Sequence, residues 1–149
     1  MMKKIWIDYF ANVAKETAKM SYARRLQVGC VIVKENTQGH FNIISIGYNG
    51  MPSGWENDCE NIIDTGTNVY YESKPEVMHA ERAALDKITR SPESSDGAIA
   101  FITTEPCLEC AKSIFASGIK EVYYINAYDR VPNVGINFLE KLGVKVCQI

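Results

Sequence analysis

The stretch AIAFITTEPCLECAKSIFASGIKEVYYI, residues 98–125, decides how this chain folds. Apolar residues at 98–103 predict a buried strand, and a second apolar run at 122–125 predicts another. Between the two runs, residues 107–117 are typical of a helix that Gly118 ends. A strand, a helix and a strand in this order predict a right-handed crossover between two parallel strands.

The sequence on both sides of this stretch completes the expected fold. Apolar residues recur at three- and four-residue steps near the start of the chain, as in a helix with one buried face. Two β-branched runs that flank a turn then predict an antiparallel hairpin. Together these elements predict an α/β fold of three layers, α/β/α, around a mixed five-stranded sheet. The further helices are expected at 5–20, 79–89 and 134–142, and the further strands at 28–33, 43–48 and 144–147.

Length, charge and composition narrow the class of protein. A chain of 149 residues with 46% apolar residues fits a single globular domain over residues 1–149 and excludes intrinsic disorder. A net charge of −2 argues against polymeric nucleic acid as a partner. The sequence has no apolar run of roughly 18 residues for a membrane span, and Asp8 interrupts the run that a signal peptide would need. We therefore expect a cytoplasmic protein with a small ligand and no membrane partner.

Residues 49–78 are too long and irregular for an ordinary connection inside a compact domain. Long loops of this kind usually serve function, so we interpret the segment as a functional insertion; a floppy insertion is the alternative. Its apolar residues predict some packing, in the form of a short helix. These residues are Trp55, Ile62, Ile63, Val69, Tyr70 and Tyr71.

Two short motifs supply metal ligands. His79 precedes Glu81 by two residues, and Cys107 and Cys110 follow 28 and 31 residues after the histidine. The cysteines are three apart at the start of the expected helix, so both sulfurs lie on one face, where amide dipoles favour thiolates. His79 and Glu81 would not face the same way in a regular helix, so His79 must occupy its less regular cap. The spacing predicts one zinc ion held by His79, Cys107 and Cys110.

The number of protein ligands predicts catalysis. Three ligands leave a fourth position for water, whose pKa falls to about 7 on zinc. Glu81 is then the expected proton carrier. This H-x-E…P-C-x-x-C pattern is the signature of zinc nucleobase deaminases. The alternatives are a redox CxxC pair, or a closed structural zinc whose fourth ligand would be Cys30, Cys59, Cys147 or His40.

Over nearly its whole length the chain resembles the deoxycytidylate deaminase family. The likeness is carried by the zinc motifs and by residues 27–33, 47–54 (GYNGMPSG), 74–81 and 109–122. It implies a cytidine deaminase-like fold and hydrolysis of dCMP to dUMP and ammonia, which feeds dTMP synthesis. It also implies a homo-oligomer, usually a hexamer, activated by dCTP and inhibited by dTTP, each bound with Mg²⁺. The implied allosteric residues are Gly47, Tyr48, Asn49, Gly50 and Gly54.

The same resemblance implies roles for residues outside the zinc motifs. Asn49 would reach the substrate sugar, the Ala80 backbone the pyrimidine carbonyl, Tyr128 the pocket wall and Arg25 a phosphate. Three of these residues have an alternative role without function. Asn49 could form a turn with Gly50, Arg25 could be an exposed cation, and Tyr128 could serve only in packing.

The chain departs from the family at several positions. Ala83 stands where an Asn is common, which leaves pocket detail open. Glu105 precedes the PCxxC motif and places a carboxylate either near the metal or in solvent. The insertion offers only Cys59 for a second, structural zinc, so one zinc is expected.

Three rival functions remain at this point. The enzyme could act also or mainly on dCTP. It could deaminate bases in single-stranded nucleic acid, which the net charge opposes. A rival from another class is a nucleotide-sensing module in which zinc is structural.

Overall fold

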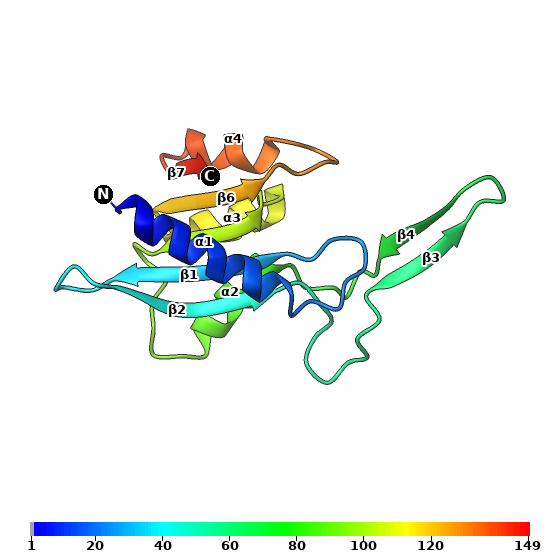
Figure 1. Cartoon of the computed structure of the whole chain (residues 1–149), viewed down its shortest axis with the longest axis horizontal. Helices are drawn as coiled ribbons and strands as arrows, with labels where there is room; N and C mark the ends of the chain where they lie inside the picture. The colour runs from blue at the N-terminus through cyan, green and yellow to red at the C-terminus, as the bar shows by residue number, and fades with distance from the viewer. Residues whose placement is uncertain (1) are drawn as a thin grey trace.

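A mixed five-stranded sheet lies at the centre of the computed structural model, which describes residues 2–149 (Figure 1). Met1, which the domain prediction includes, lies outside the described residues. The strand order is β2-β1-β5-β6-β7, with β1 antiparallel to both its neighbours and β5, β6 and β7 parallel. The sheet strands are β1 (Gly29–Glu35), β2 (Phe41–Tyr48), β5 (Ile99–Thr104), β6 (Glu121–Asn126) and β7 (Lys145–Gln148). The helices are α1 (Lys4–Ala18), α2 (Ala80–Thr89), α3 (Leu108–Ala116) and α4 (Val134–Lys141).

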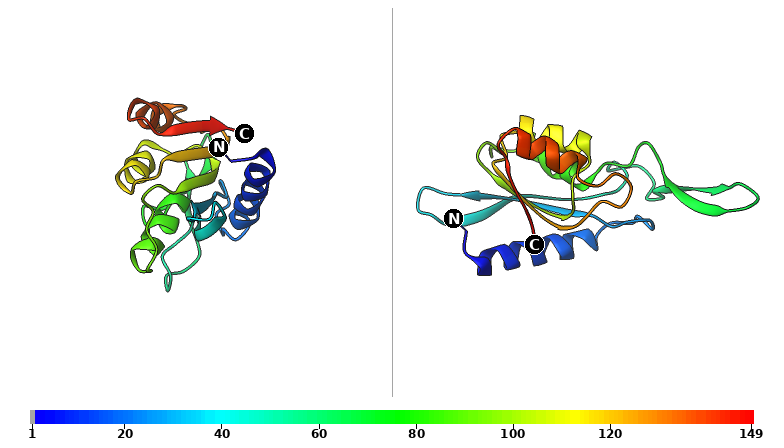
Figure 2. Two further views of the ribbon diagram at one scale, coloured as in Figure 1. Left: turned by 90° about the vertical axis from the view of Figure 1, so that its left-hand side faces the viewer. Right: turned by 90° about the horizontal axis from the view of Figure 1, so that it is seen from above.

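Helices cover both faces of the sheet and confirm the predicted three layers. Helix α1 lies on one face, and α2, α3 and α4 lie on the other (Figure 2). Side chains of β1 alternate between the two layers, since Val31 and Val33 pack with Phe10 of α1 while Cys30 and Ile32 pack toward the other helices. None of the helices in residues 2–149 is long and apolar enough to cross a membrane.

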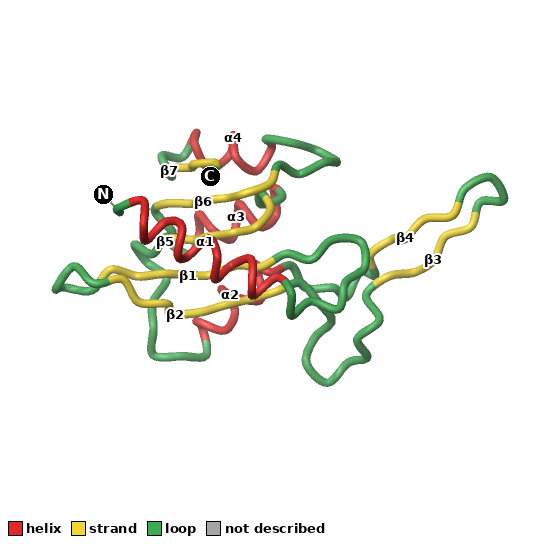
Figure 3. The backbone as a smooth tube through the Cα atoms, in the orientation of Figure 1, coloured by secondary structure: helices red, strands yellow, loops and turns green. Residues whose placement is uncertain are grey.

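Several loops gather at one end of the sheet (Figure 3). The parallel strands β5 and β6 end there, and the segments that follow them lie beside the loop that precedes β1. Ligands of α/β proteins commonly bind beyond the carboxyl ends of parallel strands. This end of the sheet is therefore where the site is built.

The insertion at 49–78 contains a hairpin, so the expected short helix was wrong. Strands β3 (Glu60–Asp64) and β4 (Val69–Ser73) pair antiparallel and project from the body (Figure 1). β-branched and aromatic residues favour strands. In the connecting turn, the Asp64 carboxylate accepts a hydrogen bond from the Gly66 amide, and Gly66 has a φ of +83°. Four of the apolar residues in the hairpin are exposed rather than packed: Ile62, Val69, Tyr70 and Tyr71.

Candidate functional site

Two helix starts bring the predicted metal ligands together. His79 is the N-cap of α2 and Cys107 the N-cap of α3, both with extended backbone, and Cys110 lies in the first turn of α3. The Nδ1 atom of His79 lies 3.6 Å from Sγ of Cys107 and 3.4 Å from Sγ of Cys110. The cap position predicted for His79 is thus present, and it turns the imidazole toward both sulfurs.

The distances within this group suit zinc. Zinc bonds of about 2.3 Å to sulfur and about 2.0 Å to nitrogen, at tetrahedral angles, place the two atom types roughly 3.5 Å apart. The three candidate ligand atoms lie within 4.8 Å of one another. In residues 2–149 no further Cys, His, Asp or Glu joins them, so the group is a three-ligand site and not a closed four-ligand one. The donor set is the one expected for a catalytic zinc.

Hydrogen bonds connect the two thiols and the imidazole. A hydrogen bond from the Cys110 thiol lowers the pKa of Cys107 to about 4. The same bond raises the pKa of Cys110, because its proton stabilises the neighbouring thiolate. Contact with the Cys107 sulfur raises the pKa of His79. Zinc binds cysteine as the thiolate, so the lowered pKa of Cys107 favours metal binding.

Glu81 lies beside the ligands without joining them. Its side chain is buried, at 5% exposure, and it lines the same pocket as His79 and Cys107. Burial raises the pKa of Glu81 to about 7. A carboxyl group that can both hold and release a proton near neutral pH is suited to general acid and base work.

Close packing of α2 on the sheet sets the position of His79 and Glu81. A Cβ on Gly47 of β2 would lie 2.3 Å from the Ala80 carbonyl oxygen and 2.5 Å from the Ala84 amide. Only glycine permits this approach. Gly47 thus has a packing role under α2, and its predicted allosteric role stays a prediction.

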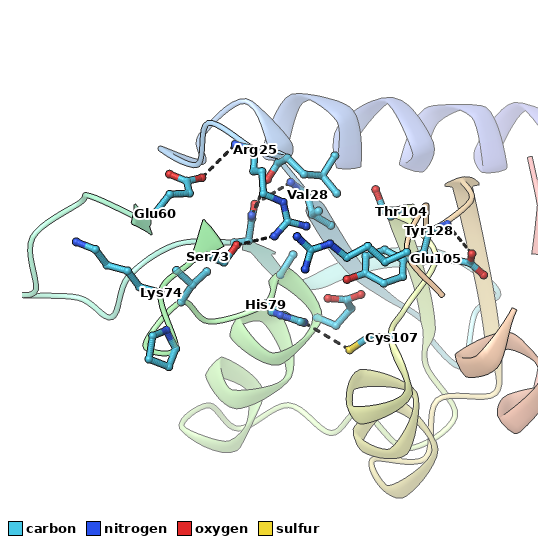
Figure 4. A pocket seen from close by; sticks show the side chains of 17 residues that line it. Arg25, Val28, Glu60, Ser73, Lys74, His79, Thr104, Glu105, Cys107 and Tyr128 are labelled. Atoms are coloured by element: carbon cyan, nitrogen blue, oxygen red, sulfur yellow. Dashed lines mark hydrogen bonds between the residues drawn. The ribbon is translucent and has the colours of Figure 1, made fainter. Parts of the chain in front are cut away.

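One cavity of about 330 Å³ is lined by His79, Cys107 and Glu81 and by all four residues predicted for the substrate (Figure 4). Its volume is in the range of small-molecule sites. Figure 4 shows Arg25, His79 and Tyr128 facing the same space. The four predicted residues that line it are Arg25, Asn49, Ala80 and Tyr128.

The structure gives Arg25 and Asn49 well-defined partners. Arg25 is partly buried, and its guanidinium donates to the Ser73 hydroxyl at 3.1 Å. The Asn49 side chain accepts from the Val28 amide and donates to the Leu26 carbonyl, both at 2.7 Å. Asn49 therefore holds the wall of the cavity, and its second amide hydrogen remains for a ligand.

Several pocket residues were missed by sequence reasoning. Arg130, Ser73 and Glu60 line the cavity. Arg130 could have been found, because it follows closely after a parallel strand whose end faces the site. Glu60 carries no such signal: its Oε1 accepts hydrogen bonds from the amides of Arg24 and Arg25, which are 36 and 35 residues away.

Glu105 does not face solvent, which was one of its two expected positions. It is 3% exposed and lines the cavity, and its carboxylate accepts hydrogen bonds from the backbone amides of Tyr128 and Asn133.

A second cavity of about 500 Å³ lies behind the GYNG segment. Tyr48, Gly50 and Gly54 line it together with Lys87 of α2 and Arg90, the C-cap of that helix. Ala83, which stands where the family commonly has Asn, lines this second cavity and not the first. The departure from the family pattern therefore lies at the second cavity.

Comparison with known proteins agrees with this site. The model for the cytidine and deoxycytidylate deaminase zinc-binding region matches residues 4–126. The chain belongs to the cytidine and deoxycytidylate deaminase family. Within this family, human deoxycytidylate deaminase is 36% identical over 129 residues, which cover 81% of this chain and 65% of that protein. The chain thus matches somewhat less than two thirds of the human relative.

Two further comparisons span almost the whole chain. ComE operon protein 2 of Bacillus subtilis is 33% identical over 144 residues, covering 97% of this chain and 71% of that protein. The crystal structure of dCMP deaminase from the cyanophage S-TIM5, in complex with dCMP and dUMP, superposes with a TM-score of 0.86. It is 37% identical and covers 100% of both chains. The predicted cytidine deaminase-like fold is confirmed.

Proposed function

We propose that this protein is a zinc-dependent deaminase that hydrolyses dCMP to dUMP and ammonia and so supplies dUMP for dTMP synthesis. The observation that carries the proposal is one cavity lined by His79 and Cys107 of the three-ligand group, by the buried Glu81 and by two arginines. The relative that superposes over its whole length is a dCMP deaminase bound to dCMP and dUMP.

Zinc held by His79, Cys107 and Cys110 would supply the Lewis acidity that makes water reactive near neutral pH. The residues of this chain do the rest. Glu81 takes a proton from the attacking water and delivers it to the amine that leaves the pyrimidine ring as ammonia. The Ala80 amide is at the first turn of α2, where helix amides have no intrahelical partner, and it donates to the pyrimidine carbonyl. Tyr128 forms the wall of the pocket.

Two arginines give the pocket a preference for a phosphorylated substrate. Arg25 and Arg130 line the cavity, and neither takes part in an ion pair in the described part of the chain. Lys74 also lines it but is paired with Glu56 and Asp58. An anionic phosphate compensates unpaired guanidinium groups. This supports a nucleotide over a nucleoside and leaves dCTP as the rival substrate.

A substrate panel tests the function and the two arginines together. We expect ammonia release to be fastest with dCMP, ahead of dCTP, CMP and deoxycytidine. Arg25→Ala and Arg130→Ala should each raise KM for dCMP by about 10- to 100-fold, because each removes a charge-assisted hydrogen bond. Turnover of deoxycytidine, which has no phosphate, should change little.

Arg24→Ala is the matched control for Arg25→Ala. Arg24 is the adjacent residue, yet it pairs with Asp58 and lies outside the cavity, so KM for dCMP should not change. Faster deamination of dCTP than of dCMP would shift the proposal to the triphosphate. If Arg25→Ala and Arg130→Ala raised KM for deoxycytidine as much as KM for dCMP, the proposed contact with the phosphate would be contradicted.

We further propose that the second cavity binds dCTP as activator and dTTP as inhibitor, with Mg²⁺. Support comes from the cations Lys87 and Arg90 in this cavity, which suit a triphosphate. Asp86 also lines the cavity, where its carboxylate pairs with Arg82 at 3.2 Å. Gly50 at this cavity exchanges backbone hydrogen bonds of 3.1 and 2.8 Å with Met78, the residue before His79. A shift of the GYNG segment would thus act on Met78, the chain neighbour of the metal ligand His79.

Steady-state rates against dCMP concentration test this regulation. We expect a sigmoidal curve that dTTP steepens and dCTP flattens. Arg90→Ala should raise the concentration at which either triphosphate has half its effect. Hyperbolic curves that neither triphosphate changes would refute the proposal. A hexamer and a cytoplasmic location stay predictions.

A further inference from the structure

The loop at 127–133, between β6 and α4, carries Tyr128 and Arg130 to the cavity. Few hydrogen bonds hold this loop. Within the described residues, two backbone amides of this loop donate hydrogen bonds, those of Tyr128 and Asn133. Both donate to the carboxylate of Glu105. The Glu105 side chain thus joins the two ends of the loop.

Glu105 is itself held firmly. It follows β5, and its own amide donates to the Asn126 carbonyl at 2.8 Å. The Asn126 side chain in turn donates to the Thr103 carbonyl at 3.0 Å. Asn133 has a left-handed backbone, with a φ of 67°, a conformation that Asn tolerates better than most residues. It is the N-cap of α4, so the second bond also ties the start of that helix.

Both carboxylate oxygens of Glu105 are used. Oε1 accepts from Tyr128 and Oε2 from Asn133 at 3.2 Å. A buried carboxylate is stable only when donors surround it, and here the donors are backbone groups of the loop. The rigid end of β5 therefore fixes a loop that has little other support.

We infer that Glu105 is a positioning residue, which holds the loop at 127–133 so that Tyr128 and Arg130 face the substrate. This inference rests on the proposed function, in which Arg130 meets the substrate phosphate. Glu105 acts through the loop and does not touch the reacting atoms.

Glu105→Gln tests the inference with almost no change of shape. An amide group replaces one oxygen and faces an N–H donor, so one of the two bonds is lost. KM for dCMP should rise about ten-fold, the effect of losing one well-placed hydrogen bond to a charged group. The value of kcat and the zinc content should change little, because Glu81 and the metal ligands are untouched. Glu93→Gln, an exposed carboxylate elsewhere, is the control and should change none of these.

A double-mutant cycle separates positioning from general stability. In an Arg130→Ala background, Glu105→Gln should raise KM for dCMP much less, because the side chain to be positioned is gone. Equal effects in both backgrounds would overturn the inference.

Proteolysis gives a readout that needs no turnover. Trypsin cleaves after arginine, so release of the loop should speed cleavage between Arg130 and Val131 by about ten-fold, in proportion to the open population. Cleavage after Arg25 should keep its wild-type rate. If Glu105→Gln does not fold, Glu105→Asp serves instead, since its shorter side chain cannot span both amides. An unchanged rate of cleavage after Arg130 in the Glu105→Gln protein would refute the role of Glu105. This readout does not depend on deaminase activity, so it can fail independently of the proposed function.

Discussion

Glu81→Gln should lower kcat for dCMP by about 10²- to 10⁴-fold, the range that general acid–base catalysis contributes. The amide cannot accept a proton from water or deliver one to the departing amine. Glu81 is buried beside the ligand group and is not part of it, so the variant should hold zinc as well as the wild type. Ammonia release and metal content per chain, measured on the same sample, check both statements.

Glu109→Gln is the matched control for this variant. Glu109 lies between the two cysteine ligands in sequence, but its side chain is exposed and paired with Lys112. Its activity should remain close to that of the wild type. A Glu81→Gln protein that kept a tenth of the wild-type rate would contradict the proton-carrier role. A wild-type protein that bound nucleotide but released no ammonia from any of the four substrates would favour the sensing module.

Cys110→Ala should abolish zinc binding and activity together, with kcat falling by at least about 10⁴-fold. Two ligands remain, which is fewer than zinc sites require, and water keeps a pKa far above neutrality without the metal. Metal content by mass spectrometry and ammonia release check the result. Removal of zinc from the wild type with a chelator should give the same loss, and added zinc should restore activity.

Cys147→Ala is the control for this cysteine. Cys147 lies half-buried in β7 and packs in the layer under α1, outside the ligand group. It should keep a full zinc content and full activity. A Cys110→Ala protein that retained both would show that the three-ligand group is not the catalytic centre.

The sequence predicted the sheet and its helices well because their signals are local. Alternating strands and helices between residues 98 and 147 determine the crossovers, and the observed elements begin and end within two residues of the predicted ones. The hairpin at 60–73 was missed because its apolar residues do not pack against the body, so their periodicity carries no information about a buried face.

The sequence by itself predicted the His/Cys/Cys group that the structure brings together, and the layers of the fold; the role of Glu81 as proton carrier stays a prediction. Both predictions rest on residue types at fixed spacings along the chain. A regular helix or strand turns such a spacing into a fixed arrangement of side chains. Only the tertiary structure decided the rest of the pocket. It buried Glu105 under a loop more than 20 residues away, set Glu60 against Arg25, and brought Arg130 into the cavity of His79. Such contacts join backbone amides to carboxylates across distant segments, and a backbone amide has the same chemistry in nearly every residue. No pattern in the sequence therefore marks which amides a buried carboxylate will bind.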